Sequence, residues 1–157
     1  MNKFAMLAAV SAIAVCAVPA AAHAQAYAGA GYTWLDSDAG DMGAVTGRLG
    51  YRFNPNFAVE GEASFGVDDD GVELDNNIGA YAVAILPVAS TFDVHGRVGY
   101  QRSEFDTPIG GFDSEGVGYG VGATWRATPN LGVRADYTRL DGDNESDAIS
   151  LGGVVNF

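Results

Sequence analysis

Ten charged or titratable side chains stand at alternate positions within otherwise apolar or glycine-rich segments: Arg48, Arg52, Glu60, Glu62, Asp93, His95, Arg97, Arg126, Arg134 and Asp136. Arginines and carboxylates can form charge-assisted hydrogen bonds, and a histidine near a carboxylate can act as a general base. Nucleophilic catalysis also needs a hydroxyl or thiol that this base can activate. No serine stands two residues beyond His95 in a lipase-like arrangement. We therefore predict a structural polar network, no catalytic residue and no enzyme.

The other acidic residues are concentrated in four polar segments, residues 36–42, 68–76, 103–115 and 141–147, which hold sixteen of the twenty acids. The last segment resembles a calcium loop, but Ser146 stands at the sixth position, where the EF-hand requires glycine. The glycine run at 116–122 matches neither phosphate-binding pattern. We predict no metal site and no cofactor. We interpret the acids as a solvated rim, with bound divalent cations as the alternative.

Composition excludes several further classes of protein. The chain has 157 residues and a formal net charge of −12, which argues against nucleic acid as a partner, because phosphate binding needs a basic surface. One cysteine, Cys16, excludes an internal disulfide and a cysteine-rich zinc site. Twenty-two glycines are about twice the usual share of roughly 7%. The length suits one domain.

Residues 1–26 are typical of a secretory signal peptide. Lys3 supplies a positive charge, residues 4–18 are apolar, and two cleavage motifs follow, which end at Ala24 and Ala26. The site after Ala26 is preferred, and the site after Ala24 stays open. A retained membrane helix is the alternative, but the apolar run is shorter than the roughly 20 residues that span a bilayer. The mature domain is then residues 27–157.

The rest of the chain alternates between apolar and small or polar residues with a period of two, as β-strands do. Eight such segments are predicted as strands: 27–36, 43–53, 57–67, 77–86, 92–102, 116–127, 131–140 and 148–157. Most have about ten residues, the length of a tilted strand that crosses a bilayer. The segment 77–86 is apolar on both faces, and there we predict Tyr81, Val83 and Ile85 on the outside.

The polar faces of these strands are predicted to point inward. Five arginines and four carboxylates in the dry core of a soluble barrel would be costly unless they paired, whereas an aliphatic and aromatic outside suits lipid. Short Pro/Asn turns at 54–56, 87–91 and 128–130 alternate with the longer acidic segments. We predict an all-β fold, an eight-stranded antiparallel up-and-down transmembrane β-barrel. Its interior is wide enough only for side chains to fill it.

Residues 116–139, which read GVGYGVGATWRATPNLGVRADYTR, resemble the penultimate hairpin of small eight-stranded outer-membrane β-barrel proteins. This group includes the OmpA transmembrane domain, the OmpX group and the opacity-type porin-like proteins. Residues 49–53, 79–82 and 97–100 carry similar motifs, and the resemblance extends over 27–157. Phe157, a terminal aromatic on an alternating strand, is similar to the C-terminal signal read by the barrel-assembly machinery. These motifs are specific for the class and separate its members poorly.

The resemblance implies a protein exported to the cell outer membrane of Gram-negative type. We predict a monomer with a structural or surface role in the cell envelope and a side-chain-filled interior. Its expected partners are outer-membrane lipids and lipopolysaccharide, with divalent cations as bridges, and the barrel-assembly machinery during insertion. The alternatives are a narrow porin-like channel for small cations, and a surface adhesin or host-interaction protein that acts through acidic extracellular loops. A lipid-modifying enzyme and a soluble periplasmic barrel are the remaining rivals.

Overall fold

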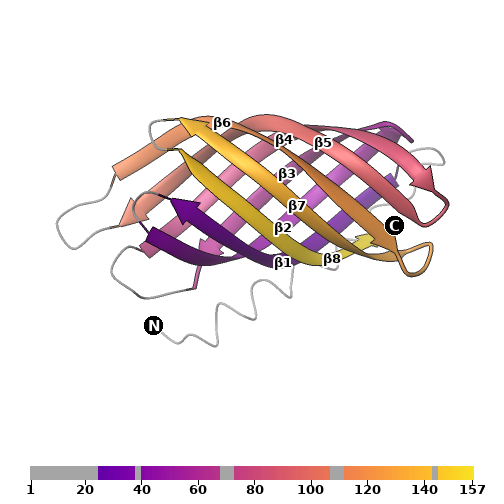
Figure 1. Cartoon of the computed structure of the whole chain (residues 1–157), viewed down its shortest axis with the longest axis horizontal. Coiled ribbons are helices and arrows are strands. Elements are labelled where there is room, and N and C mark those ends of the chain that lie inside the picture. The colour runs from indigo at the N-terminus through magenta and orange to yellow at the C-terminus, as the bar shows by residue number, and fades with distance from the viewer. Residues whose placement is uncertain (1–24, 38–39, 68–72, 107–111, 143–144) are drawn as a thin grey trace.

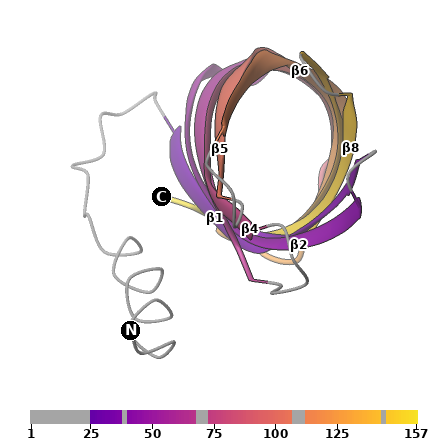
Figure 2. The ribbon, with the colours of Figure 1, turned by 90° about the vertical axis from the view of Figure 1, so that its left-hand side faces the viewer.

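The structure is a computed structural model that describes residues 25–37, 40–67, 73–106, 112–142 and 145–157. All but Gln25 and Ala26 of the predicted signal segment therefore lies outside the described residues. Eight strands follow one another along the chain: β1 (Gln25–Ser37), β2 (Gly40–Asn54), β3 (Phe57–Gly66), β4 (Glu73–Ala89), β5 (Phe92–Asp106), β6 (Phe112–Arg126), β7 (Leu131–Gly142) and β8 (Ser146–Asn156). Each strand pairs with the next in antiparallel fashion, and β8 pairs with β1, so the sheet closes (Figures 1 and 2). The predicted eight-stranded barrel is confirmed.

Short turns at residues 55–56, 90–91 and 127–130 join the strands at one end of the barrel, which we call the turn end. Both ends of the described barrel meet here, since the Phe157 backbone N–H donates to the Ala26 carbonyl at 3.0 Å. The second turn is shorter than the predicted 87–91, because β4 continues to Ala89. Pro87 has no N–H to give to the ladder, and the register with β5 shifts between Pro87 and Ala89.

The strands also run further than predicted at the opposite end, which we call the loop end. Strands β1 and β2 pair up to Ser37 and Gly40, and β5 and β6 pair up to Phe105 and Phe112. Much of the four predicted acidic segments is therefore strand. Some of the acids at this end therefore lie on strands and not in loops. Among the described residues, no helix is long and apolar enough to cross a membrane.

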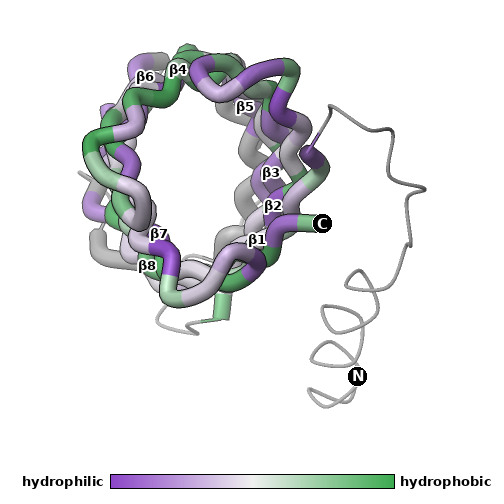
Figure 3. Tube along the Cα trace, turned by 90° about the vertical axis from the view of Figure 1, so that its right-hand side faces the viewer, coloured by the Kyte–Doolittle hydropathy of each residue, from purple (hydrophilic) through white to green (hydrophobic). Residues whose placement is uncertain are grey.

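Apolar and small or polar residues alternate along most of the strands, and hydrophilic and hydrophobic positions are interspersed around the barrel (Figure 3). On β6, Val121 and Trp125 are 63% and 53% exposed, whereas Thr124 between them is 5% exposed. The large exposed side chains of the barrel include Trp34, Tyr51, Phe53, Phe57, Phe92, Tyr100, Tyr119, Trp125, Tyr137 and Phe157. The apolar face thus points outward and the polar face inward, as an outer-membrane barrel requires.

One predicted face is wrong. Tyr81, Val83 and Ile85 of β4, which we predict on the outside from the sequence, point into the barrel and are 3%, 2% and 7% exposed. Both faces of this segment are apolar, so its alternation does not show which face points into the barrel. The register decides it, because Tyr81 lies opposite Glu60 on β3 and Gly99 on β5, which both face inward.

Candidate functional site

The structure brings all ten side chains of the sequence-predicted polar network into the barrel interior, where each is buried or half-buried. They divide into two groups. The central network consists of Arg48, Glu60, Glu62, His95, Arg97, Arg134 and Asp136. The turn-end cluster consists of Arg52, Asp93 and Arg126. The central network has three arginines and three carboxylates, so these charges balance.

Asp136 on β7 is the main junction of the central network. Its carboxylate accepts from Arg48 NH1 at 2.7 Å and from Arg134 NH2 at 2.9 Å. The His95 ring nitrogen Nε2 lies 2.7 Å from the Oδ1 atom of Asp136. These partners come from β2, β5 and β7, so one carboxylate links strands on opposite sides of the barrel.

Glu62 on β3 extends the network to one more strand. It accepts from Arg48 NH2 at 2.7 Å and from Arg97 NH1 at 2.9 Å. Two other nitrogens of Arg97, Nε and NH2, have no hydrogen-bond partner in the described part of the chain. The guanidinium instead lies over the Tyr81 ring, with its carbon 3.6 Å from the ring centroid. A cation over an aromatic face is attracted by the ring quadrupole.

Two tyrosines belong to this interior and were missed at the level of the sequence. The Tyr27 hydroxyl donates to Glu60 Oε1 at 2.5 Å, and the Tyr81 hydroxyl donates to Gln101 Oε1 at 2.9 Å. Tyr27 shares its parity with inward glycines on β1, which was a usable signal. Tyr81 had no such signal, and its ring fits because Gly79, Gly99 and Gly118 carry no Cβ there.

Glu60 is enclosed more completely than any other carboxylate that bonds a guanidinium in the network. Its side chain is 0% exposed, and it forms an ion pair with Arg134, whose side chain is 6% exposed. A carboxylate this deeply buried is stable only with a charged or strongly hydrogen-bonded partner. Arg134 and the Tyr27 hydroxyl supply that partnership.

The turn-end cluster lies closer to the turn end of the barrel than the central network and contains one more basic than acidic side chain. Arg126 bonds Asp93 through two nitrogens, with NH2 3.0 Å from Oδ1, and also donates to the Ser90 carbonyl at 3.2 Å. The Arg52 NH2 group lies 3.8 Å from Asp93 Oδ2. This end of the interior therefore carries a net positive charge, whereas the acidic segments lie at the loop end of the barrel.

Uncharged layers occupy the loop-end half of the interior. The hydroxyls of Thr33, Thr46 and Ser64 form a chain across β1, β2 and β3, with separations of 2.7 and 2.8 Å. Beyond them, the buried side chains of Leu35 and Leu140 pack together with Ala44. The charged network is thus followed toward the loop end by hydroxyls and then by leucines.

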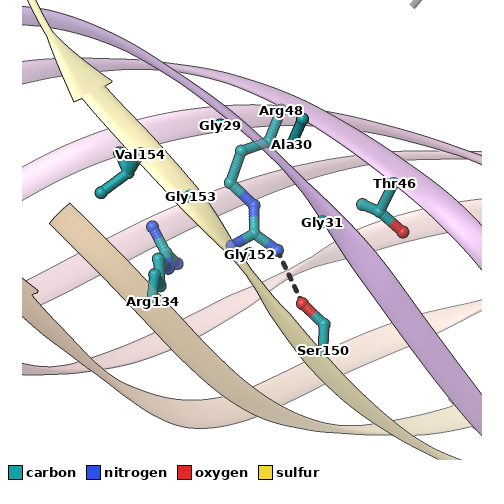
Figure 4. Close-up of a pocket in the computed structure, with 10 residues that line it drawn as sticks. All are labelled: Gly29, Ala30, Gly31, Thr46, Arg48, Arg134, Ser150, Gly152, Gly153 and Val154. Carbon is teal, nitrogen blue, oxygen red and sulfur yellow. Dashed lines mark hydrogen bonds between the residues drawn. The ribbon is translucent and has the colours of Figure 1, made fainter. Parts of the chain in front are cut away.

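A small space remains beside Arg48 and Arg134, where Ser150 Oγ lies 3.5 Å from Arg48 NH2 (Figure 4). Glycines 29, 31 and 152 line it, and its volume is about 10 Å³. A single water molecule needs about that much room. The glycines on the inner face therefore accommodate side chains and leave no wide passage at this level.

The site offers little for catalysis or metal binding. His95 bonds a carboxylate, and both side chains are at least 97% enclosed, so a lipid substrate cannot reach the imidazole. Among the described residues, no group of three or more His, Cys, Asp or Glu side chains is arranged to hold a metal ion. What the arrangement does provide is charge pairing between strands that are far apart in the sequence.

Comparisons with known proteins agree with the barrel geometry. The N-terminal β-barrel of OprF from Pseudomonas aeruginosa superposes with a TM-score of 0.69 at 16% identity, covering 85% of this chain and 97% of that chain. Ail of Yersinia pestis, solved in complex with the heparin analogue sucrose octasulfate, gives 0.61 at 18%, covering 86% and 99%. Neisserial surface protein A gives 0.58 at 23%, covering 85% and 97%.

At these identities the solved structures establish a shared fold, and no curated protein matches the sequence. The match to a protein family covers more of the chain than the match to any of these three solved structures. The family of outer membrane protein beta-barrel domains matches residues 5–157 of this chain, and the chain therefore belongs to this family.

Proposed function

We propose that this outer-membrane protein acts as a closed barrel with a structural and surface role in the cell envelope. The observation that carries the proposal is the filled interior, in which the central network crosses the barrel and neutral layers follow it toward the loop end. Moving an ion past these layers would require breaking buried ion pairs, which is expensive. The filled interior therefore disfavours a narrow channel for small cations.

Planar-bilayer recordings test the closed interior. We expect the protein purified from outer membranes to give no large, steady conductance at moderate voltage, because side chains occupy the axis from Arg52 to Leu35. A barrel of related size with a known open pore, reconstituted in the same bilayers, controls for insertion. Stable cation-selective openings in most recordings would contradict the proposal and select the channel.

The loop end supports a surface role. In barrels of this class the short turns face the periplasm and the opposite end faces outward. Glu115 and Glu145 are exposed there, and 16 of the 20 acids of the chain fall in the segments at this end. Carboxylates of this density favour divalent cations, and we propose that these cations bridge them to lipopolysaccharide phosphates. Contact with basic host surfaces is the second candidate, favoured by the same negative rim.

We propose that the protein has no enzymatic activity and no cofactor. The enclosed His95–Asp136 pair supports this, because its imidazole is bonded to a buried carboxylate and faces other network members. An esterase screen with lipid A and phospholipids is expected to show no hydrolysis above a heat-denatured control. Activity that disappears in a His95→Ala variant would overturn this.

We also propose export through a cleaved signal peptide. The sequence motif prefers cleavage after Ala26, whereas the pairing of the first strand supports the alternative site after Ala24. Gln25 and Ala26 pair with Arg52 and Tyr51, and the Ala26 carbonyl accepts the Phe157 N–H. Cleavage after Ala26 would remove that acceptor from the closing strand. Intact-mass measurement of the protein from outer membranes is expected to give a chain that begins at Gln25. A mass that begins at Tyr27 would show that the pairing is dispensable.

Phe157 completes the proposal for assembly. Its ring is 55% exposed on the outer face, while its N–H is held by β1. An exposed terminal aromatic on the last strand supports recognition by the barrel-assembly machinery before insertion. The closed ladder leaves no strand edge to pair with another copy, which supports a monomer.

A further inference from the structure

The outer surface has an apolar groove between two neighbouring rows of cross-strand partners. The first row runs Val59, Ala82, Val98, Tyr119, Arg139, and the second runs Phe57, Ala84, Gly96, Val121, Tyr137. The groove has a volume of about 860 Å³, within the roughly 300–1,000 Å³ of small-molecule sites. It rises obliquely across β3 to β7, from the turn end toward the loop end.

The groove is hollowed because its smallest residues lie in the middle. Ala82, Ala84 and Gly96 form the floor, and aromatic rings stand at both ends. The fold itself does not require glycine at position 96, since an added Cβ would come no closer than 3.9 Å to the Gly120 carbonyl oxygen. The depression is therefore a property of the outer surface and is not imposed by packing inside the barrel.

A single basic residue closes the groove at the loop end. Of the eight bases in the chain, Lys3 precedes the barrel and five arginines face its interior, which leaves Arg102 and Arg139 on the outer face. Arg139 lines the groove and bonds Glu145 at 2.8 Å, with side chains 42% and 67% exposed. Asp147 is the cross-strand neighbour of Arg139 and accepts from the Tyr137 hydroxyl at 2.9 Å. The exposed Arg139–Glu145 pair is weak, so a phosphate can replace the Glu145 carboxylate on the guanidinium.

From this arrangement we infer that the groove is a binding site for one anionic membrane lipid, with an acyl chain along Ala82, Ala84 and Gly96 and the head phosphate on Arg139. The position of the cation fixes the orientation, because Arg139 lies one outward position beyond Tyr137 toward the loop end. The lipid therefore belongs to the outward-facing leaflet. This contact is direct and needs no bridging cation, so it is independent of the role proposed for the acidic rim.

Native mass spectrometry of the protein from outer membranes tests the site, with dimyristoyl phosphatidic acid as the probe. Dimyristoyl phosphatidylcholine has the same chains and a zwitterionic head. We expect one phosphatidic acid to bind in preference to phosphatidylcholine. Arg139→Gln should weaken phosphatidic acid binding roughly tenfold, the loss expected for a hydrogen bond to a charged group. Gly96→Leu, which fills the floor, should weaken binding of both lipids.

Two matched variants separate the groove from general effects. Arg102→Gln removes the other outward arginine, and Gly47→Leu enlarges an outward glycine that lies outside the groove and has no atom within 4 Å of an added Cβ. Both should bind like the natural protein, and heat-modifiable gel migration confirms that each variant is folded. Equal losses in Arg102→Gln and Arg139→Gln, or in Gly47→Leu and Gly96→Leu, would overturn the inference.

Discussion

Arg134→Met is expected to lower the free energy of unfolding by about 3–5 kcal/mol, the range found when one partner of a buried ion pair is removed. Glu60 would keep only the Tyr27 hydroxyl as the partner bonded to Oε1, with its side chain 0% exposed. Methionine fills much of the arginine stem but cannot compensate the carboxylate. Urea unfolding in detergent micelles, followed by tryptophan fluorescence, measures the change in midpoint.

Two further variants make this result interpretable. Arg102→Met removes an arginine whose pair with Glu115 is half-exposed and 3.5 Å long, and it should change the midpoint little. Adding Glu60→Gln to Arg134→Met should recover part of the loss, because the uncompensated charge is then gone. If Arg134→Met and Arg102→Met shifted the midpoint equally, the central network would contribute nothing to stability.

Gly50→Val on β2 should destabilise the barrel by about 1–3 kcal/mol, the usual effect of overpacking. A Cβ at Gly50 would overlap the Tyr27 ring. The ring would have to move, and Tyr27 would lose its bond to Glu60. The substitution would therefore disturb the central network through Tyr27, which is itself uncharged.

Gly47→Val on the same strand is the matched control. Gly47 faces outward, and an added Cβ there would meet no atom within 4 Å. The two substitutions are chemically identical and differ only in the face of β2 that they modify. Comparison of their urea midpoints therefore isolates interior packing, and equal destabilisation would show that β-strand propensity or backbone entropy dominates instead.

Much of the fold could be predicted because the alternation along a transmembrane strand shows which of its faces contacts lipid. On β6, glycines alternate with Val117, Tyr119 and Val121, so one face can only be the lipid side. The failure on β4 has the opposite cause, since Ala80, Ala82 and Ala84 are as apolar as Tyr81 and Val83. There the register with β3 and β5 decides the face, because Tyr81 lies opposite Glu60 and Gly99, and alternation within one strand does not contain this information.

The inward position of the charged residues followed from the same alternation, but their partners did not. Arg48 bonds Asp136, which is 88 positions away, and His95 bonds the same carboxylate from a third strand. Such pairs depend on the stagger of the strands around the barrel, which sets the residues that share a height. The stagger emerges only when the ladder closes, and no spacing along the chain reveals it.

The seam between β1 and β8 has a consequence for the time course of folding. Eleven positions pair there, from Tyr27 with Asn156 to Ser37 with Ser146. This edge of the first strand can therefore pair only after the last strand is in place. Contacts at such a sequence separation form slowly, because a long loop has to close before they stabilise anything. Every intermediate before that moment has two unpaired edges in an environment without water to satisfy them. Once the seam has formed, its contacts must break together before any strand can separate from the barrel. We therefore expect a slow unfolding rate, more than a large free energy of unfolding, to keep the barrel folded.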